Sequence, residues 1–236
     1  KNEIKFCPKK SKERLKSMIE TRPDWCVSRQ RVWGVPLPIF IHKKTKEVLI
    51  DDKVIENIAN IFEKEGSDCW FSDDPKRFLG NKYNSNDYEK LSDIVEVWFD
   101  SGSTHAFVLE KRKDLKWPAS MYLEGSDQHR GWFHSSLLES CGTRGRAPYE
   151  SILSHGFVVD GKGLKMSKSL GNVISPEDIL KKYGADILRI WVASSNYEED
   201  LRIDNSIVEQ HADSYRKIRN TFRYLLGNLN DKCEHI

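Results

Sequence analysis

The chain has 236 residues, with 38 Lys and Arg against 36 Asp and Glu, so its formal net charge is +2 at pH 7. Because 38% of the residues are hydrophobic and 11% aromatic, it can bury a core and is not disordered by composition. Its five cysteines are scattered without a Cys-x-x-Cys pair, which argues against a disulfide framework or structural zinc and suits a reducing cytosol. No apolar run reaches the roughly 18 residues of a membrane helix and no signal peptide is present, so we expect a cytoplasmic protein without a membrane partner.

The first 51 residues combine a short helix with chain that prolines keep extended. Leu15, Met18 and Ile19 have helical spacing, which predicts an amphipathic helix. The segment 22–38 contains Pro23, Pro36 and Pro38, so turns and extended chain are expected there. Two tryptophans alternate in it with two arginines: Trp25, Arg29, Arg31 and Trp33. Such a face either grips a nucleic acid or packs as aromatics beside salt-bridged arginines, and composition favours neither.

A hairpin and a small inserted subdomain are expected over residues 37–92. The hairpin joins 37–42 to 48–50 through a polar turn. Apolar residues at helical spacing then predict a helix that starts near Val54 and ends near Gly66. The polar segment that follows has isolated apolar anchors: Trp70, Phe71, Phe78 and Leu79. We infer no chemistry from this subdomain.

Residues 93–103 predict a strand that runs into a glycine turn. The strand carries Trp98, which is either a core residue or the wall of a small apolar pocket. Aromatic residues in strands more often serve packing, so the residue by itself favours the core.

Residues 120–160 predict a strand, a helix and a second strand. The strands cover about 121–124 and 151–159, and the helix runs from about 127 to 140. This order implies a right-handed crossover and parallel strands. Ligands of open α/β sheets bind beyond the carboxyl ends of the strands, which here are 124–128 and 155–157.

The first strand end carries groups that suit a nucleoside. Gly125 allows close approach to the backbone, and the Asp127 carboxylate can accept two hydrogen bonds from a ribose diol. Glu124 and Gln128 offer acceptors for a ribose hydroxyl or an α-ammonium group. The helix start at 126–127 adds N–H donors. The alternative is that Glu124 and Asp127 only cap this helix.

The second strand end and the loop behind it complete the expected nucleotide site. His155 and the backbone of 156–158 could contact an adenine edge. The loop 161–171 contains three glycines, which permit opening and closing, and the lysines Lys165 and Lys168, which suit a polyphosphate. The alternative is a solvated basic loop, which is the usual role of such charge runs.

Three helices are expected beyond this loop. Ser175 and Pro176 start the first, and Gly184 ends it. Residues 185–194 form an apolar helix, and Ser206 with Glu209 has capping-box spacing for a third, long helix. The apolar register of that helix requires partner helices. Its basic residues are either solvated or lie along a nucleic acid: Arg216, Lys217, Arg219 and Arg223.

Several of these segments together resemble the class I aminoacyl-tRNA synthetases, and within them the bacterial isoleucyl-tRNA synthetase family. The segments are RPDWCVSRQRVWGVP (22–36), VWFDSGS (97–103), YLEGSDQHRGWF (122–133), SHGF (154–157), KMSKS (165–169) and GADILRIWVAS (184–194). KMSKS indicates class I in general, whereas DQHRGWF points to isoleucine. The resemblance covers nearly the whole chain and is weakest over 52–92.

The resemblance implies a two-step reaction on isoleucine, ATP and tRNA(Ile). Isoleucine attacks the α-phosphate of ATP in the presence of Mg²⁺, and the acyl group of the adenylate then passes to the terminal ribose of tRNA. In this family the residues matching Glu124, Gly125 and Asp127 hold the ribose. The matching residues beside adenine are His155, Gly156 and Phe157. Lys165 and Lys168 would stabilise charge that develops on the triphosphate, without a covalent nucleophile.

The amino-acid end follows from the same resemblance. Gln128 would hold the amino-acid end, and Trp98 and Trp132 would line the isoleucine pocket. The family's His-x-Gly-His motif, its editing motifs and its zinc-binding cysteines are absent, so no zinc site is expected here. The chain also lacks an initial Met. We therefore expect an internal fragment that by itself activates isoleucine poorly or not at all.

The resulting prediction is an α/β protein. It contains the second half of a Rossmann-like parallel nucleotide-binding fold with a small inserted subdomain, followed by an α-helical segment. The expected divisions are 1–51 (return from an editing insertion), 52–92 (subdomain), 93–160 (catalytic half-domain), 161–205 (signature loop and stem-contact helices) and 206–236 (start of an anticodon-binding bundle). We expect a monomer. The alternatives are a non-catalytic ATP- or tRNA-binding piece, a valyl- or leucyl-type synthetase, and a nucleotidylyltransferase.

Overall fold

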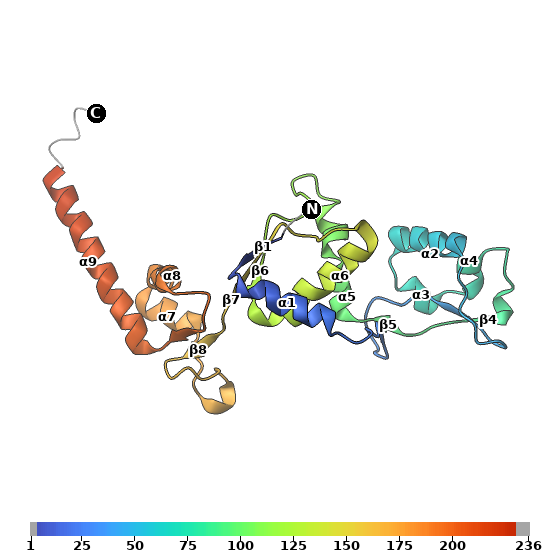
Figure 1. The fold of residues 1–236 in the computed structure, drawn as a ribbon, viewed down its shortest axis with the longest axis horizontal. Helices are drawn as coiled ribbons and strands as arrows, with labels where there is room; N and C mark the ends of the chain where they lie inside the picture. The colour runs from blue at the N-terminus through green and yellow to red at the C-terminus, as the bar shows by residue number, and fades with distance from the viewer. Residues whose placement is uncertain (1–3, 230–236) are drawn as a thin grey trace. The chain divides into compact units, whose positions relative to one another are not determined.

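A computed structural model describes residues 4–229 of the chain (Figure 1). Within this range the chain forms two compact units, the first made of residues 4–5, 12–122 and 128–151 and the second of 6–11, 123–127 and 152–229. Cys233 and the last part of the predicted helical bundle lie outside the described residues. Across the described residues, no helix combines the length and the apolar character needed to cross a bilayer.

The first unit is built around two packed helices, α5 (Val97–Gly102) and α6 (Trp132–Arg144). A short antiparallel pair precedes them, in which β2 (Ser28–Arg29) pairs with β5 (Ile94–Val95). The predicted strand over 93–103 is therefore wrong beyond Val95. The Glu96 side chain accepts a hydrogen bond from the Trp98 amide (3.0 Å) and so begins α5. The amphipathic helix predicted from Leu15, Met18 and Ile19 is confirmed as α1 (Lys10–Glu20), with Leu15 buried.

The inserted subdomain has its own aromatic core. It contains three helices, α2 (Asp52–Glu65), α3 (Cys69–Ser72) and α4 (Pro75–Leu79). They pack beside an antiparallel pair of strands, β3 (Phe40–His42) and β4 (Tyr88–Lys90). A 3-10 turn, η1 (Ser85–Asp87), leads directly into β4. The buried residues of the subdomain are Phe40, Val54, Ile58, Trp70, Phe78 and Leu79. The predicted anchors are thus core residues, except Phe71, which is exposed.

The hairpin predicted at 37–51 is confirmed: Ile41 and Val48 form an antiparallel bridge, and backbone hydrogen bonds join His42 to Glu47 (2.9 Å) and Leu49 to Phe40 (2.9 Å). On its other edge, β3 pairs with the more distant strand β4, which the sequence does not predict. The helix predicted from Val54 to Gly66 is confirmed: Gly66 follows α2, and its N–H bonds to the carbonyl of Phe62.

The predicted parallel strand pair is confirmed in a three-stranded sheet. Its strand order is β1 (Lys5–Cys7), β7 (Ser151–His155) and β6 (Tyr122–Gly125). A parallel bridge between Ala119 and Tyr149 leads into the two predicted strands. The helix between them starts later than predicted, because residues Ser126–Arg130 form a 3-10 turn (η3) and Gly131 precedes α6.

The second predicted strand is interrupted, so 151–159 is not one element. After β7, residues Val158–Asp160 form β8, which pairs in parallel with β9 (Leu201–Ile203). The break lies at Gly156, where a Cβ atom would overlap the backbone of Glu199. The chain can change sheets there because glycine admits this approach.

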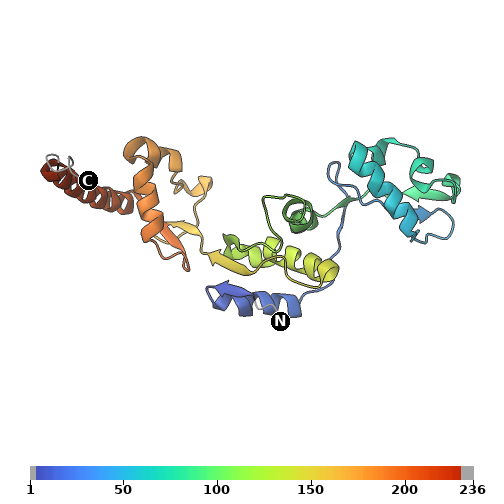
Figure 2. The same cartoon turned by 90° about the horizontal axis from the view of Figure 1, so that it is seen from above.

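Three helices complete the second unit, as predicted (Figure 2). They are α7 (Pro176–Tyr183), α8 (Ala185–Ser194) and α9 (Asn205–Leu229). Their shared core contains Ile179, Ile187, Trp191, Ile203, Val208 and Ala212. Ser175 caps α7 as predicted, since its hydroxyl accepts from the Glu177 amide at 3.2 Å.

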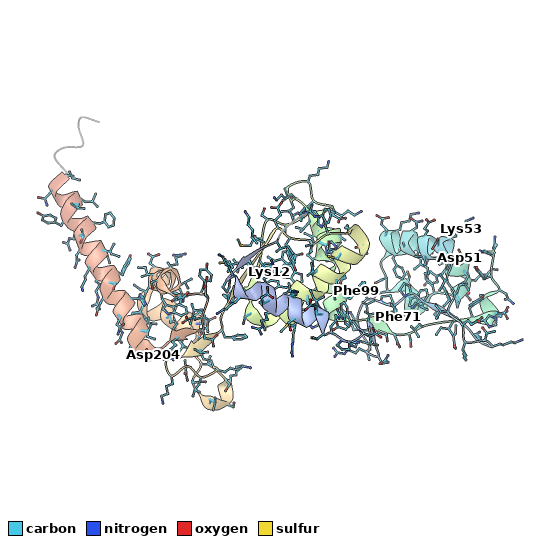
Figure 3. All side chains as sticks on the ribbon, in the orientation of Figure 1. Lys12, Asp51, Lys53, Phe71, Phe99 and Asp204 are labelled. Atoms are coloured by element: carbon cyan, nitrogen blue, oxygen red, sulfur yellow. The ribbon has the colours of Figure 1, made fainter. Side chains whose placement is uncertain are left out.

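The cap of α9 differs from the prediction. Asp204, labelled in Figure 3, accepts from the Ile207 amide at 2.8 Å, and Ser206 donates its own hydroxyl hydrogen to Asp204. Ser206 is therefore not the capping residue, because it already lies within the first turn. Farther along α9 the predicted apolar face is exposed at Ile218, Phe222, Leu225 and Leu226.

Candidate functional site

The two strand ends meet at Gly125. A Cβ atom on this buried glycine would lie 2.6 Å from an Asp127 carboxylate oxygen and 3.7 Å from His155 Cε1. The end of β6 and the end of β7 therefore lie together, as the parallel order requires. Glu124 and Asp127 are exposed, so two carboxylates reach the surface on either side of the buried Gly125.

The backbone of 155–157 is already engaged within the second unit. Gly156 donates to the carbonyl of Tyr197 (2.9 Å), and the Phe157 amide donates to the Asp200 carboxylate (2.8 Å). The Phe157 carbonyl accepts from Leu201 (2.7 Å). The N–H groups of Gly156 and Phe157 are thus engaged, whereas a carbonyl oxygen can accept a second hydrogen bond, so contact between this backbone and an adenine edge stays a prediction. The side chains here are the half-buried His155 ring and the Phe157 ring, which is 51% exposed.

The loop 161–171, called the flap below, leaves its lysines in solvent. Lys165 and Lys168 are exposed, and no ion pair among residues 4–229 engages either one. Gly163 and Gly171 have φ angles of 82° and 64°, which glycine adopts readily. Gly161 is expected to permit opening and closing of the loop, but in the structure its missing Cβ makes room for the Asp204 carboxylate.

Trp98 belongs to neither core cluster of the described residues and lines a pocket of about 410 Å³ in the first unit. The indole is 41% exposed, and its ring edge would lie 2.9 Å from a Cβ atom at Gly131. Trp25 and the buried Glu96 also line the pocket. Of the two alternatives for Trp98, a core residue or the wall of a small pocket, the structure therefore supports the pocket wall.

Trp132 is packed behind this region and does not line the pocket. Its ring stacks on Tyr122 with centroids 3.9 Å apart, and its indole N–H donates to the Ser101 carbonyl at 3.0 Å. The Gln128 side-chain oxygen accepts from the Trp132 amide at 2.9 Å. A Cβ atom at Gly131 would overlap that same oxygen, so Gln128 and Trp98 flank one glycine.

A buried polar cluster lies between α5 and α6. Both Glu139 carboxylate oxygens are buried without a hydrogen-bond partner among the described residues, and Gly102 packs directly against them. Burial, with a smaller contribution from Asp100, raises the pKa of Glu139 to about 8. Burial also lowers the pKa of His105. Glu139 is therefore largely protonated at neutral pH.

The tryptophan–arginine segment splits into a packed part and an exposed part. Arg22 lies over the Trp25 ring (5.4 Å to the centroid), and Arg29 donates to the carbonyls of Cys26 and Ser28. Arg31 and Trp33 are exposed, Trp33 to 89%. Trp25 and Arg29 are therefore packed, as the packing alternative predicts. Arg31 and Trp33 remain an accessible cation and an accessible aromatic ring.

Three residues have a structural role in these regions that the sequence analysis does not predict. Glu96 caps α5 and lines the Trp98 pocket, and Asp160 and Asn172 bind the base of the flap. Asp160 precedes Gly-x-Gly and Asn172 follows glycine, which are turn signals. The described residues contain no group of three or more His, Cys, Asp or Glu side chains that could hold a metal ion.

Comparison with known proteins gives concordant results. A sequence model of the family "tRNA synthetases class I (I, L, M and V)" matches residues 1–204. The chain is 85% identical over 235 residues to the isoleucine–tRNA ligase of Pelagibacter ubique and 57% identical to that of Caldicellulosiruptor saccharolyticus. It covers 100% and 98% of its own length in these matches but spans only 26% of each relative.

Solved structures support the same fold. The fold is similar to a leucyl-tRNA synthetase of Agrobacterium radiobacter K84, solved with tRNA and LeuAMS (TM-score 0.65, 19% identity), over 92% of this chain and 31% of that one. It is also similar to the methionyl-tRNA synthetase of Mycobacterium tuberculosis, solved with methionyl-adenylate (TM-score 0.56, 17% identity), over 89% and 33%. The predicted α/β fold class with a parallel sheet is therefore confirmed.

Proposed function

Because this chain belongs to the class I tRNA synthetases of the isoleucine, leucine, methionine and valine group, we propose that the protein containing it is an isoleucine–tRNA ligase. The isoleucine carboxylate attacks the α-phosphorus of ATP, the bond to pyrophosphate breaks, and isoleucyl-adenylate forms. Its acyl group then passes to the terminal ribose of tRNA(Ile), and AMP leaves. We further propose a cytoplasmic monomer.

The observation that carries this proposal is the meeting of Asp127 and His155 at Gly125. The Asp127 carboxylate can accept both hydroxyls of a ribose, with Glu124 as a second acceptor, while the absence of a side chain at Gly125 makes room for the Asp127 carboxylate. The exposed Phe157 ring and the half-buried His155 ring supply faces for the adenine.

The flap lysines would act on the triphosphate. Lys165 and Lys168 are exposed cations on long stems, and the charge that develops on departing pyrophosphate needs such partners. Mg²⁺ is held in such sites mostly by substrate phosphates and only one or two carboxylates, which agrees with a metal that arrives with ATP. This chemistry consists of positioning and electrostatics, and it requires no covalent nucleophile.

Trp98, Gln128 and Trp132 would hold isoleucine. The Trp98 ring supplies an apolar wall. The Gln128 side chain lies beside the same Cβ position of Gly131 as the Trp98 ring, and its amide can pair with the amino-acid end. Trp132 contributes through its stack on Tyr122 and its hydrogen bonds, which fix Gln128 and α5. Selectivity for a branched apolar side chain follows from such a wall.

Pyrophosphate exchange by the natural gene product tests the proposal. We expect exchange that depends on isoleucine, with kcat/KM for valine roughly 10–200-fold lower because valine lacks one methylene group. Leucine should support little exchange. A protein that exchanges pyrophosphate equally well with leucine or valine, or not at all with isoleucine, would contradict the assignment. The natural gene product is needed because the 236-residue chain spans 26% of its relatives and lacks the His-x-Gly-His motif.

A further inference from the structure

The base of the flap is closed by two side chains, Asp160 and Asn172, which we call the clasp. Asp160 ends β8, and Asn172 follows the glycine that ends the flap. An Asp160 oxygen accepts from the Asn172 amide group at 2.8 Å. This hydrogen bond joins the two ends of the flap, both within the second unit.

Asp160 also organises the first half of the flap. Its other oxygen accepts from the amides of Lys162 (3.0 Å) and Leu164 (2.8 Å). Backbone hydrogen bonds between Asp160 and Leu164 and between Gly163 and Asp160 complete a tight turn. The carboxylate thus fills the mouth of that turn and fixes the backbone that leads to Lys165.

Asn172 organises the signature residues themselves. Its side-chain oxygen accepts from the Ser167 amide at 2.9 Å, and its NH₂ group also donates to the Lys165 carbonyl at 3.3 Å. A backbone N–H can only donate, so the oxygen must face Ser167 and the NH₂ group must face Asp160. Ser167 in turn caps the 3-10 turn Lys168–Leu170 (η4) through the Leu170 amide.

Besides the clasp and the turn at Asp160, an antiparallel bridge between Val159 and Lys165 holds the flap. Residues 162–165 and 168–171 are exposed, and Met166 is the flap residue that packs against the apolar core of the second unit. An exposed loop of this kind keeps a defined backbone only through its hydrogen bonds. The clasp contacts the backbone of Lys165 and of Ser167 and leaves both lysine side chains free.

We propose that Asp160 and Asn172 are positioning residues that hold the flap backbone in the geometry from which Lys165 and Lys168 reach the triphosphate. This inference rests on the proposed function. Neither residue would touch substrate; both act through the two lysines. Loss of the clasp lowers the fraction of molecules with a competent flap, so it lowers kcat for adenylate formation and leaves KM for isoleucine unchanged.

An exchange of the two side chains gives a sharp test. Asp160→Asn alone sets two NH₂ groups against each other, and Asn172→Asp alone sets two carboxylates against each other. The double variant Asp160→Asn/Asn172→Asp reverses the hydrogen bond between them. It keeps the bonds to the Lys162, Leu164 and Ser167 amides and loses only the bond to the Lys165 carbonyl.

The measurement is isoleucine-dependent pyrophosphate exchange by the natural gene product and the three variants. We expect each single variant to lower kcat about tenfold or more, and the double variant to recover most of that loss, with KM for isoleucine constant throughout. The control is Asn205→Ala, an exposed asparagine at the start of α9, which should behave as wild type. Hydrogen exchange should show the Ser167 amide protected in the wild type and the double variant only.

The outcomes separate the two proposals. Unchanged kcat in both single variants, or a double variant no better than the worse single one, would overturn the role of the clasp while the proposed function stands. A rise in KM for isoleucine equal to the fall in kcat would also overturn it, since that indicates an effect on isoleucine binding and not on the flap alone. A wild-type protein without isoleucine-dependent exchange would overturn the proposed function and the clasp's role with it.

Discussion

The Trp98 region and the flap fix their functional residues in opposite ways. Around Trp98 the side chains are fixed: Trp132 is stacked and hydrogen-bonded, and Gln128 bonds to the backbone. In the flap the backbone is fixed by the clasp, and the lysine side chains are left in solvent. Each region holds rigid what its proposed ligand requires.

This difference matches the two tasks. Recognition of an apolar side chain depends on shape, so a pocket wall must not move. Stabilisation of a departing polyphosphate depends on charge that follows the reaction, which long flexible cations can supply if their backbone is well placed. Substitutions should therefore raise KM in the first region and lower kcat in the second.

The largest effect is expected for Lys168→Ala. Removal of a group that stabilises transition-state charge should lower kcat for pyrophosphate exchange by roughly 10²–10³-fold, with KM for isoleucine nearly unchanged. Lys162→Ala is the matched control, because this lysine is an exposed residue of the same flap whose clasp contact is made by its backbone. Equal kcat values for both variants and the wild type would remove the flap from the mechanism.

Trp98→Ala should give the next largest effect, and this effect should be on KM for isoleucine. Loss of the pocket wall should raise KM for isoleucine by at least about tenfold, because apolar contact area is lost, while kcat changes less. Trp33→Ala serves as its control, since that indole is 89% exposed and lies outside the pocket. A KM for isoleucine that Trp98→Ala leaves unchanged would show that the pocket serves another purpose.

Glu139→Gln should change how the stability of the Trp98 region depends on pH. The folded pKa of about 8 exceeds the ordinary value of 4.5, so the protonated form stabilises the fold below pH 4.5 and this stabilisation is lost as pH rises toward 8. At pH 9 the glutamine variant should be more stable than the wild type by roughly 1–3 kcal/mol. The α5 and α6 opening free energy from native-state hydrogen exchange measures this, and parallel pH profiles for the two proteins would contradict it.

The smallest effect concerns the helix behind the flap. Asp204→Ala removes the cap of α9 and should cost about 1 kcal/mol of local stability, whereas Ser206→Ala should cost only a few tenths. Amide exchange near the start of α9 distinguishes the two variants. Larger loss of protection in Ser206→Ala than in Asp204→Ala would restore the capping box expected from the sequence.

Features set by neighbouring residues could be predicted from the sequence. The caps of α7 and α2 lie next to the helices they terminate, so Ser175 and Gly66 are visible as local signals. The parallel order of β6 and β7 follows from a connection through a helix. Gly125 and His155 could therefore be expected at one edge of the sheet.

Features set by distant partners could not be predicted. The interruption after β7 depends on the Glu199 backbone, and β3 takes a second partner from 88–90 in addition to the adjacent hairpin arm. The sequence predicts a strand through Trp98, yet the Glu96 side chain caps a helix there. The clasp joins residues 12 apart in sequence, and nothing in the spacing of Asp160 and Asn172 indicates that they meet.

The most direct measurement is hydrogen exchange of the natural gene product with and without a non-hydrolysable isoleucyl-adenylate analogue. If the two strand ends and the flap bind one nucleotide, the analogue should slow exchange in three separate segments: 124–128, 155–157 and 165–168. Protection of the first two segments and not of the third would restrict the site to the sheet. Saturating analogue with no added protection at 124–128 and 155–157 would contradict the account.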